Sequence, residues 1–242
     1  MFCLPLNKTQ PAGCKKPWHL PSVLKTFSAI TLLSTAIFIL SVFSSCAPKA
    51  YKSLQRTEGD AACLQKFHPQ IQRVLYQAAV EVAGNHLSGI LLIKHMPDSS
   101  LRLLFTNEAG FKFFDFEFSK SGDFKVHSII EKMNKKAVKE TLQKDFKLIL
   151  MQMTNSILSA YKFKRQNPDE RYFANQTGKD FYYYITNNAC DSLLRMERGS
   201  RTRKVMEAFS EGLKGGVPET IRVRHNNFNF DIQLKRIYDH AE

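Results

Sequence analysis

The sequence has no apolar run long enough to predict a transmembrane helix. The run Ala29–Phe43 has 15 residues, whereas crossing a bilayer takes about 20. The first 45 residues have no acidic side chain but contain four lysines. A basic start, a short apolar core and the small pair Ser44-Ser45 before Cys46 are typical of a bacterial lipoprotein signal. We therefore predict a signal peptide at residues 1–45 and a lipid on Cys46, with an uncleaved signal anchor as the alternative.

The sequence also lacks recognisable catalytic and metal-binding motifs. It has no Gly-x-Ser-x-Gly, no His-Glu-x-x-His and no phosphate-cradling glycine loop. The histidines beyond Cys46 are scattered along the chain, without metal-ligand spacing. We expect a binding protein with no cofactor and no metal, and not an enzyme. A hydrolase whose site has no familiar motif is one alternative.

Cysteine is scarce, and only three of the five cysteines lie beyond residue 45. If Cys46 carries lipid, Cys63 and Cys190 form an even pair in an oxidising compartment. A disulfide between them and two separately buried thiols fit the sequence equally well.

Basic residues outnumber acidic ones, and the net charge is +13. They are dispersed along a chain that we expect to be exported, which argues against nucleic acid as a partner. Anionic lipid head groups are the more natural partner for a basic protein tethered to a membrane. A generally solvated basic surface is the alternative.

Residues 46–72 are predicted to form a tether and a short lead-in helix, and residues 73–242 to form one domain. From about Val74, short runs rich in β-branched and aromatic residues are separated by turn residues, as in antiparallel all-β sheets. Ten to twelve strands are expected. A C-terminal hairpin is predicted from the alternation in 221–235. One amphipathic helix is predicted at 135–153, where apolar residues recur at three- and four-residue steps up to Met153.

Period-two alternation assigns inward-facing side chains to several strands. Phe114, Phe116 and Phe118 share one face, with Asp115 and Glu117 on the wet face. A sheet of this size has an inner face that a helix would cover, leaving either an apolar cavity or a packed core. The predicted cavity-lining residues are Leu103, Phe105, Phe114, Phe116, Phe118, Leu142, Phe146, Phe228, Phe230, Ile232 and Leu234.

Two segments resemble the LolB/LolA-like family of outer-membrane lipoprotein receptors. One is Leu101–Phe111 with the acidic strand that follows it, and the other runs from Arg203 through Val217-Pro218 to the last hairpin. The likeness covers residues 74 to 236 in element order. The Ser-Ser-Cys signal is also similar to that of Bacteroidetes-type lipoproteins.

The resemblance implies an α+β, mostly β fold: a strongly curved antiparallel half-barrel of about eleven strands, roofed by one or more helices. It implies that the concave face holds acyl chains of lipoprotein or phospholipid, passed on by a periplasmic carrier protein. In this family a protruding loop with an exposed leucine helps insert cargo into the membrane. The matching loop here contains Asn107, Glu108, Ala109 and Gly110. Ala109 replaces the leucine and buries less apolar area, so Phe111 and Phe113 are the candidates for an apolar tip.

The residues after Cys46 bear on the location. Ala47 stands where an aspartate would be the inner-membrane retention signal in enteric bacteria, and no acidic run for surface export follows. The family comparison therefore implies the periplasmic face of the outer membrane. The expected function is lipoprotein reception or envelope lipid handling, and the alternative is a structural lipoprotein that scaffolds an envelope assembly.

Overall fold

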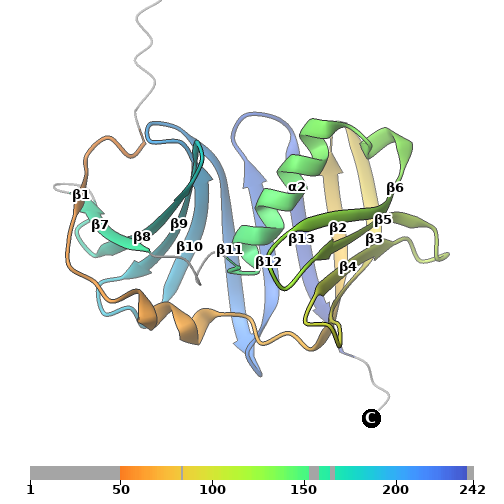
Figure 1. Cartoon of the computed structure of the whole chain (residues 1–242), viewed down its shortest axis with the longest axis horizontal. Coiled ribbons are helices and arrows are strands. Elements are labelled where there is room, and N and C mark those ends of the chain that lie inside the picture. The colour runs from red at the N-terminus through yellow and green to blue at the C-terminus, as the bar shows by residue number, and fades with distance from the viewer. Residues whose placement is uncertain (1–49, 83, 153–157, 164–166, 239–242) are drawn as a thin grey trace, which may run out of the picture. The chain divides into compact units, whose positions relative to one another are not determined.

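The computed structural model describes residues 50–238, except 83, 153–157 and 164–166. In this part of the chain, thirteen antiparallel strands form one sheet (Figure 1). The strands are β1 (Leu54–Arg56), β2 (Arg73–Val82), β3 (Asn85–His95), β4 (Leu101–Thr106), β5 (Lys112–Phe118), β6 (Phe124–Ile129), β7 (Ser159–Phe163), β8 (Glu170–Thr177), β9 (Asp180–Asn187), β10 (Leu193–Gly199), β11 (Lys204–Lys214), β12 (Val217–His225) and β13 (Phe230–Ile237). The helices are the 3₁₀ turns η1 (Ala61–Phe67) and η2 (Glu131–Met133) and the α-helix α2 (Lys136–Ile149). The predicted mostly β, open and curved antiparallel fold is confirmed.

Two meanders make up the sheet, and the last strand joins them. Strands β2 to β6 pair in sequence order, as do β7 to β13, and β13 then pairs with β2. The edge strands are β1, which pairs with β7, and β6. The sheet is therefore an open half-barrel rather than a closed one.

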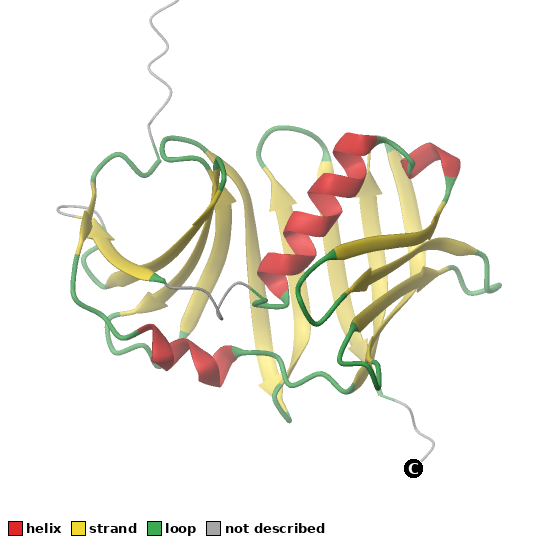
Figure 2. Ribbon diagram, in the orientation of Figure 1, coloured by secondary structure: helices red, strands yellow, loops and turns green. Residues whose placement is uncertain are grey.

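Helix α2 covers the inner face because it connects distant strands. It follows β6, at one edge of the sheet, and leads to β7, next to the other edge. A connection of this kind has to cross a face of the sheet, and Figure 2 shows α2 lying across it. The buried side of α2 presents Leu142, Phe146 and Ile149 to the sheet. The helix ends at Ile149, before the predicted end, and Met153 lies outside the described residues.

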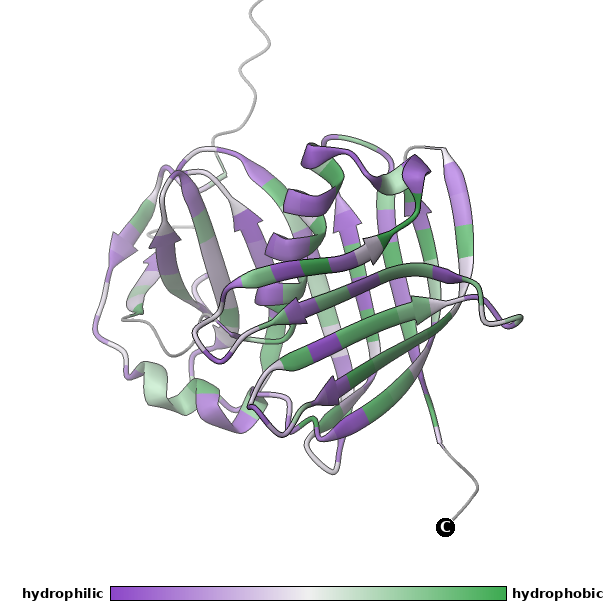
Figure 3. Ribbon diagram, turned by 45° about the vertical axis from the view of Figure 1, so that its right-hand side comes forward, coloured by the Kyte–Doolittle hydropathy of each residue, from purple (hydrophilic) through white to green (hydrophobic). Residues whose placement is uncertain are grey.

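Hydrophobic and hydrophilic residues alternate along several strands, as the coloured bands in Figure 3 show. In β8 and β9, however, both faces are covered. Phe173 and Tyr184 face the main core, whereas Tyr172 and Tyr183 belong to a second apolar cluster with Tyr51 and Ile185. Residues of the predicted tether thus cover the outer face of these strands.

The predicted tether contains one strand that the sequence pattern did not indicate. β1 has three residues, and Gln55 pairs with Lys162 of β7. Such a short segment carries no periodicity, so its conformation depends on the partner strand. The predicted lead-in helix corresponds to η1. Cys63 in η1 is bonded to Cys190 in the β9–β10 turn, with the sulfur atoms 1.99 Å apart.

The wet face predicted for β5 is an ion-pair network. Arg102 of β4 contacts Asp115 at 2.5 Å and Glu117 at 3.0 Å, and His127 contacts Glu117 at 2.8 Å. Asp115 is buried beneath Arg102 and Lys112 rather than solvated. Burial opposes its ionisation, but hydrogen bonds from these two cations lower the pKa of Asp115 below its ordinary value.

Candidate functional site

An open cavity lies at one end of the half-barrel, and we call it the end cavity. It has a volume of about 640 Å³, within the usual range for small-molecule sites. The β3–β4 and β5–β6 turns, the segment between η1 and β2, and the C-terminal end of α2 surround it. Its apolar residues are Ile71, Leu101, Phe118 and Leu150, and its polar residues include His68, His95, Lys120 and Gln152.

The lining of the end cavity suits an amphiphilic ligand, because it combines apolar side chains with a positive charge. No acidic residue lines it, and Lys120 contributes a positive charge. The apolar residues are buried or half-buried, so a chain lying on them would leave water. In the described part of the chain, no group of three or more His, Cys, Asp or Glu side chains could hold a metal.

The predicted cavity-lining residues come together, but mainly as a filled core. Ten of the eleven are at most 2% exposed and belong to one cluster. The rings of Phe114 and Phe116 stack with centroids 4.2 Å apart, and Phe146 of α2 meets Phe114 edge-on at 6.0 Å. Phe118 is a predicted residue that also lines the end cavity.

Phe228 is a correction to the predicted set. It is 49% exposed and lies in the turn before β13, which begins at Phe230. The alternation that we extended back to residue 228 therefore ends at the strand boundary. The ring of Phe228 packs on His225 instead, with centroids 4.9 Å apart.

The predicted insertion loop is the tight turn between β4 and β5, which projects from the right side of the molecule in Figure 1. The amide of Phe111 donates to the side chain of Asn107, and the Gly110 amide donates to the Asn107 carbonyl. Gly110 has a φ of +83°, which glycine adopts without a steric cost. Phe111 beside this turn is 58% exposed, whereas Phe113 is half-buried against the core.

The predicted signal peptide and Cys46 lie outside the described residues. Among the helices of the described part, none is long and apolar enough to cross a membrane.

A buried charge cluster fixes α2 on the sheet. Asp145 of α2 is fully buried and accepts a hydrogen bond of 2.7 Å from Nη2 of Arg198 in β10. His225 of β12 places Nε2 3.0 Å from Asp145 Oδ2, an ion-pair distance without the alignment of a hydrogen bond. The His225 Nδ1–H donates to the Phe230 carbonyl at 2.8 Å. The cluster thus joins one helix to two strands.

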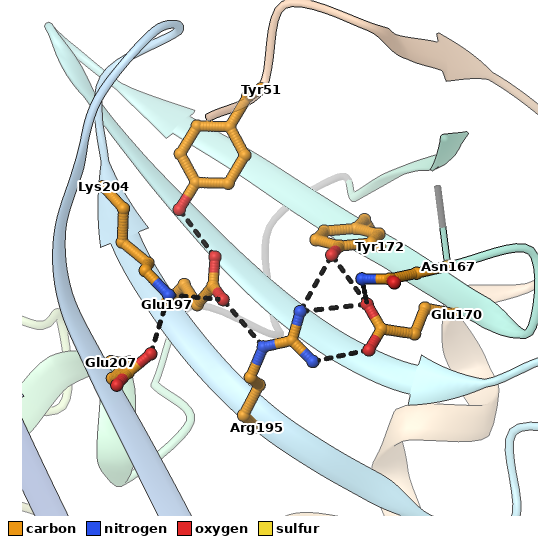
Figure 4. Close-up of polar contacts among 8 residues, drawn as sticks. All are labelled: Tyr51, Asn167, Glu170, Tyr172, Arg195, Glu197, Lys204 and Glu207. Atoms are coloured by element: carbon orange, nitrogen blue, oxygen red, sulfur yellow. Dashed lines mark hydrogen bonds and ion pairs between the residues drawn. The ribbon is translucent and has the colours of Figure 1, made fainter. Parts of the chain in front are cut away.

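A second polar network lies on the outer face of β8 to β11 (Figure 4). Arg195 donates to both carboxylate oxygens of Glu170, at 2.7 and 2.9 Å, and to Glu197 at 2.7 Å. Glu197 also accepts a hydrogen bond of 2.7 Å from Tyr51 and contacts Lys204. Every carboxylate here has a cationic partner, so the network is structural rather than a free acid or base.

The network predicts an acid-sensitive contribution to stability. Hydrogen bonds from Arg195 hold the pKa of Glu170 below its ordinary value. Because the pKa of Glu170 is lowered in the folded protein, the ionised carboxylate stabilises the fold fully above its pKa in the unfolded chain. This stabilisation is lost as the pH falls through the pKa in the folded protein. Glu170→Gln is therefore expected to lower the free energy of unfolding at pH 7. Its difference from the wild type should shrink below about pH 5. Urea unfolding across this range tests this, and a pH-independent difference would contradict it.

Sequence reasoning missed most residues of the end cavity. His95 is the last residue of β3, His68 follows η1, and Lys120 lies in the β5–β6 turn, so periodicity gives little information on where these side chains point. Ser99 in the β3–β4 turn and Ser121 and Gly122 in the β5–β6 turn also line the cavity. Folding brings these turns to one end of the sheet.

No protein-family model matches the chain, and no curated protein matches it in sequence. Among solved structures, the chain is similar to a DUF1329 family protein from Desulfovibrio piger, with 12% identity, a TM-score of 0.37, and coverage of 75% of this chain and 91% of the other. It is also similar to a "putative outer membrane lipoprotein-sorting protein domain" from Vibrio parahaemolyticus, with 10% identity, a TM-score of 0.41, and coverage of 74% and 90%.

Proposed function

We propose that this chain is an envelope lipoprotein that binds acyl chains in the end cavity, as a step in lipoprotein reception or lipid handling. The observation that carries the proposal is the end cavity itself, whose lining combines apolar and polar side chains and contains no acidic residue. An acyl chain would lie on Ile71, Leu101 and Phe118, and a polar head group would remain at the rim. Burying each methylene of such a chain contributes about 0.8 kcal/mol.

The anchor and the location form the second part of the proposal. Cys46 would carry lipid and hold the domain at the periplasmic face of the outer membrane. The exposed Phe111 beside the β4–β5 turn supports a role of this turn in touching a bilayer, because an exposed aromatic ring suits the membrane interface. A periplasmic carrier protein is the proposed donor of the cargo.

One observation favours the second candidate function, a scaffold in an envelope assembly. Most of the inner face is packed solid, with ten predicted cavity residues buried against one another and α2. A scaffold needs no space for a ligand beyond this core. The two candidates differ in whether the end cavity takes up an acyl chain.

Photocrosslinking tests the proposal. The lipidated full chain is reconstituted in vesicles that contain a photoreactive palmitoyl phospholipid, and the crosslinked peptides are mapped. Crosslinks should concentrate on peptides containing Leu101, Phe118 and Leu150. Leu101→Gln should reduce the crosslink yield about tenfold, since a loss of about 1.4 kcal/mol in binding changes an equilibrium constant tenfold.

Leu213→Gln is the matched control, because Leu213 is exposed near the end of β11 and does not line the end cavity. Unfolding midpoints of both variants show whether the domain remains folded. Equal yields for the two variants, or no crosslinks above background at the end cavity, would favour the scaffold.

A further inference from the structure

A second pocket lies on the opposite face of the sheet from the main core, and we call it the tyrosine pocket. It has a volume of about 590 Å³. Its walls include four aromatic rings, and Asn175 and Gln176 add amide groups. The aromatic residues are Tyr51, Tyr161, Phe181 and Tyr183.

The walls of the tyrosine pocket are held in place by contacts beneath it. The ring of Tyr51 stacks on Tyr183 with centroids 4.3 Å apart, and Phe181 stacks on the same ring at 6.0 Å. The hydroxyl of Tyr51 donates to Glu197, which Arg195 holds from the other side (Figure 4). The pocket therefore needs little reorganisation to receive a ligand.

The pocket carries positive charge that its own structure does not neutralise. Lys52 and Arg201 line it and are exposed, and no acidic residue lines it. Within the described residues, neither cation forms an ion pair or a hydrogen bond. The acidic Glu197 below the pocket is already occupied by Tyr51, Arg195 and Lys204. An anionic group is the complementary ligand.

The chain enters the domain at this pocket. The Ala50 amide donates to the Thr202 carbonyl at 2.9 Å, and Thr202 lines the pocket. Cys46 lies four positions before Ala50 in the sequence, so the two can be at most about 14 Å apart. A lipid on Cys46 would hold the tyrosine pocket close to the head groups of the bilayer. This step rests on the anchor in the proposed function.

We propose that the tyrosine pocket binds the phosphate head group of an anionic phospholipid in the membrane to which the chain is tethered. Lys52 and Arg201 contact the phosphate, and the tyrosine rings lie at head-group level, where such side chains are favoured. Binding here would fix how the half-barrel faces the bilayer. The acyl-chain site at the end cavity is a separate site at the end of the sheet.

Native mass spectrometry of the lipidated full chain, extracted in a non-ionic detergent, tests this inference. The protein is titrated with phosphatidylglycerol, phosphatidylcholine or inorganic phosphate. Phosphatidylglycerol adducts should dominate, and Lys52→Gln/Arg201→Gln should lower their apparent association constant about thirtyfold. Both side chains are exposed, so the double variant should remain folded.

Lys94→Gln/Lys125→Gln is the charge-matched control, because both lysines are exposed and lie outside the pocket. It should leave the adducts unchanged. Equal losses in the two double variants, equal binding of phosphatidylcholine, or displacement of phosphatidylglycerol by inorganic phosphate would each overturn the inference. The intact mass of the same sample reports the lipid on Cys46 independently. A missing anchor is therefore distinguishable from an empty pocket.

Discussion

Replacing Asp145 by alanine is expected to lower the free energy of unfolding by about 3–5 kcal/mol, because a buried cation is left without its counter-ion. Asp145 is fully buried, and Arg198 lies 2.7 Å away with a side chain only 6% exposed. Water cannot solvate the guanidinium in its present position. We expect α2 to loosen from β10 and β12, and the urea midpoint to fall accordingly.

The matched control is Asp180→Ala. Asp180 of β9 forms an ion pair with Lys144 of the same helix, also at 2.7 Å, but both side chains are partly exposed. Pairs of this kind contribute about 0–1 kcal/mol. Both variants remove an aspartate that pairs with a cation at 2.7 Å between α2 and the sheet, and the two pairs differ most in burial. Similar losses of unfolding free energy in the two variants would contradict the prediction that burial makes the Asp145 pair the more important one for stability.

Removing the disulfide with Cys63→Ser/Cys190→Ser is expected to cost about 2–5 kcal/mol. The bond joins residues 127 apart in sequence, and closing a loop of this size restricts the unfolded chain strongly, by about 5 kcal/mol in the chain-entropy estimate. The bond also fastens η1, whose Leu64 is buried in the main core. Changing both cysteines avoids an unpaired thiol.

A reductant provides the control for this prediction. Dithiothreitol should lower the urea midpoint of the wild type to that of the double variant and leave the double variant itself unchanged. A wild-type midpoint that does not respond to the reductant, while the thiols become reactive to alkylation, would contradict the predicted stabilisation.

Much of the sheet could be predicted, because the alternation of apolar and polar residues within each strand indicates which side chains face the core. The alternation in the C-terminal hairpin assigned Ile232 and Leu234 to the inner face, and both are buried, opposite the buried Val223 and Ile221. The helical period likewise assigned Leu142 and Phe146 to the buried side of α2. Phe228 shows where this reasoning stops, because a turn residue can match the period of a strand without belonging to it.

The candidate sites could be predicted only in part. Of the eleven side chains that the sequence assigned to the inner face, ten are buried there. The sequence could not distinguish a filled core from an open one, because packing depends on how volumes add across strands distant in sequence. The end cavity forms where the β3–β4 and β5–β6 turns meet the segment before β2 and the end of α2, which are distant from one another in the sequence. The tyrosine pocket depends on the contact of Tyr51 with Tyr183, 132 positions further along the chain.

The sequence by itself determined the strand periodicity, the single amphipathic helix and the pairing candidates Cys63 and Cys190, since each depends on residue type and spacing. Only the tertiary structure decided the order of the strands in the sheet, the contacts of Asp145 with Arg198 and His225, and the positions of the two pockets. These features are set by long-range contacts between β13 and β2 and between α2 and the sheet. Such contacts minimise the exposed apolar area of the whole chain, a quantity that no local pattern contains.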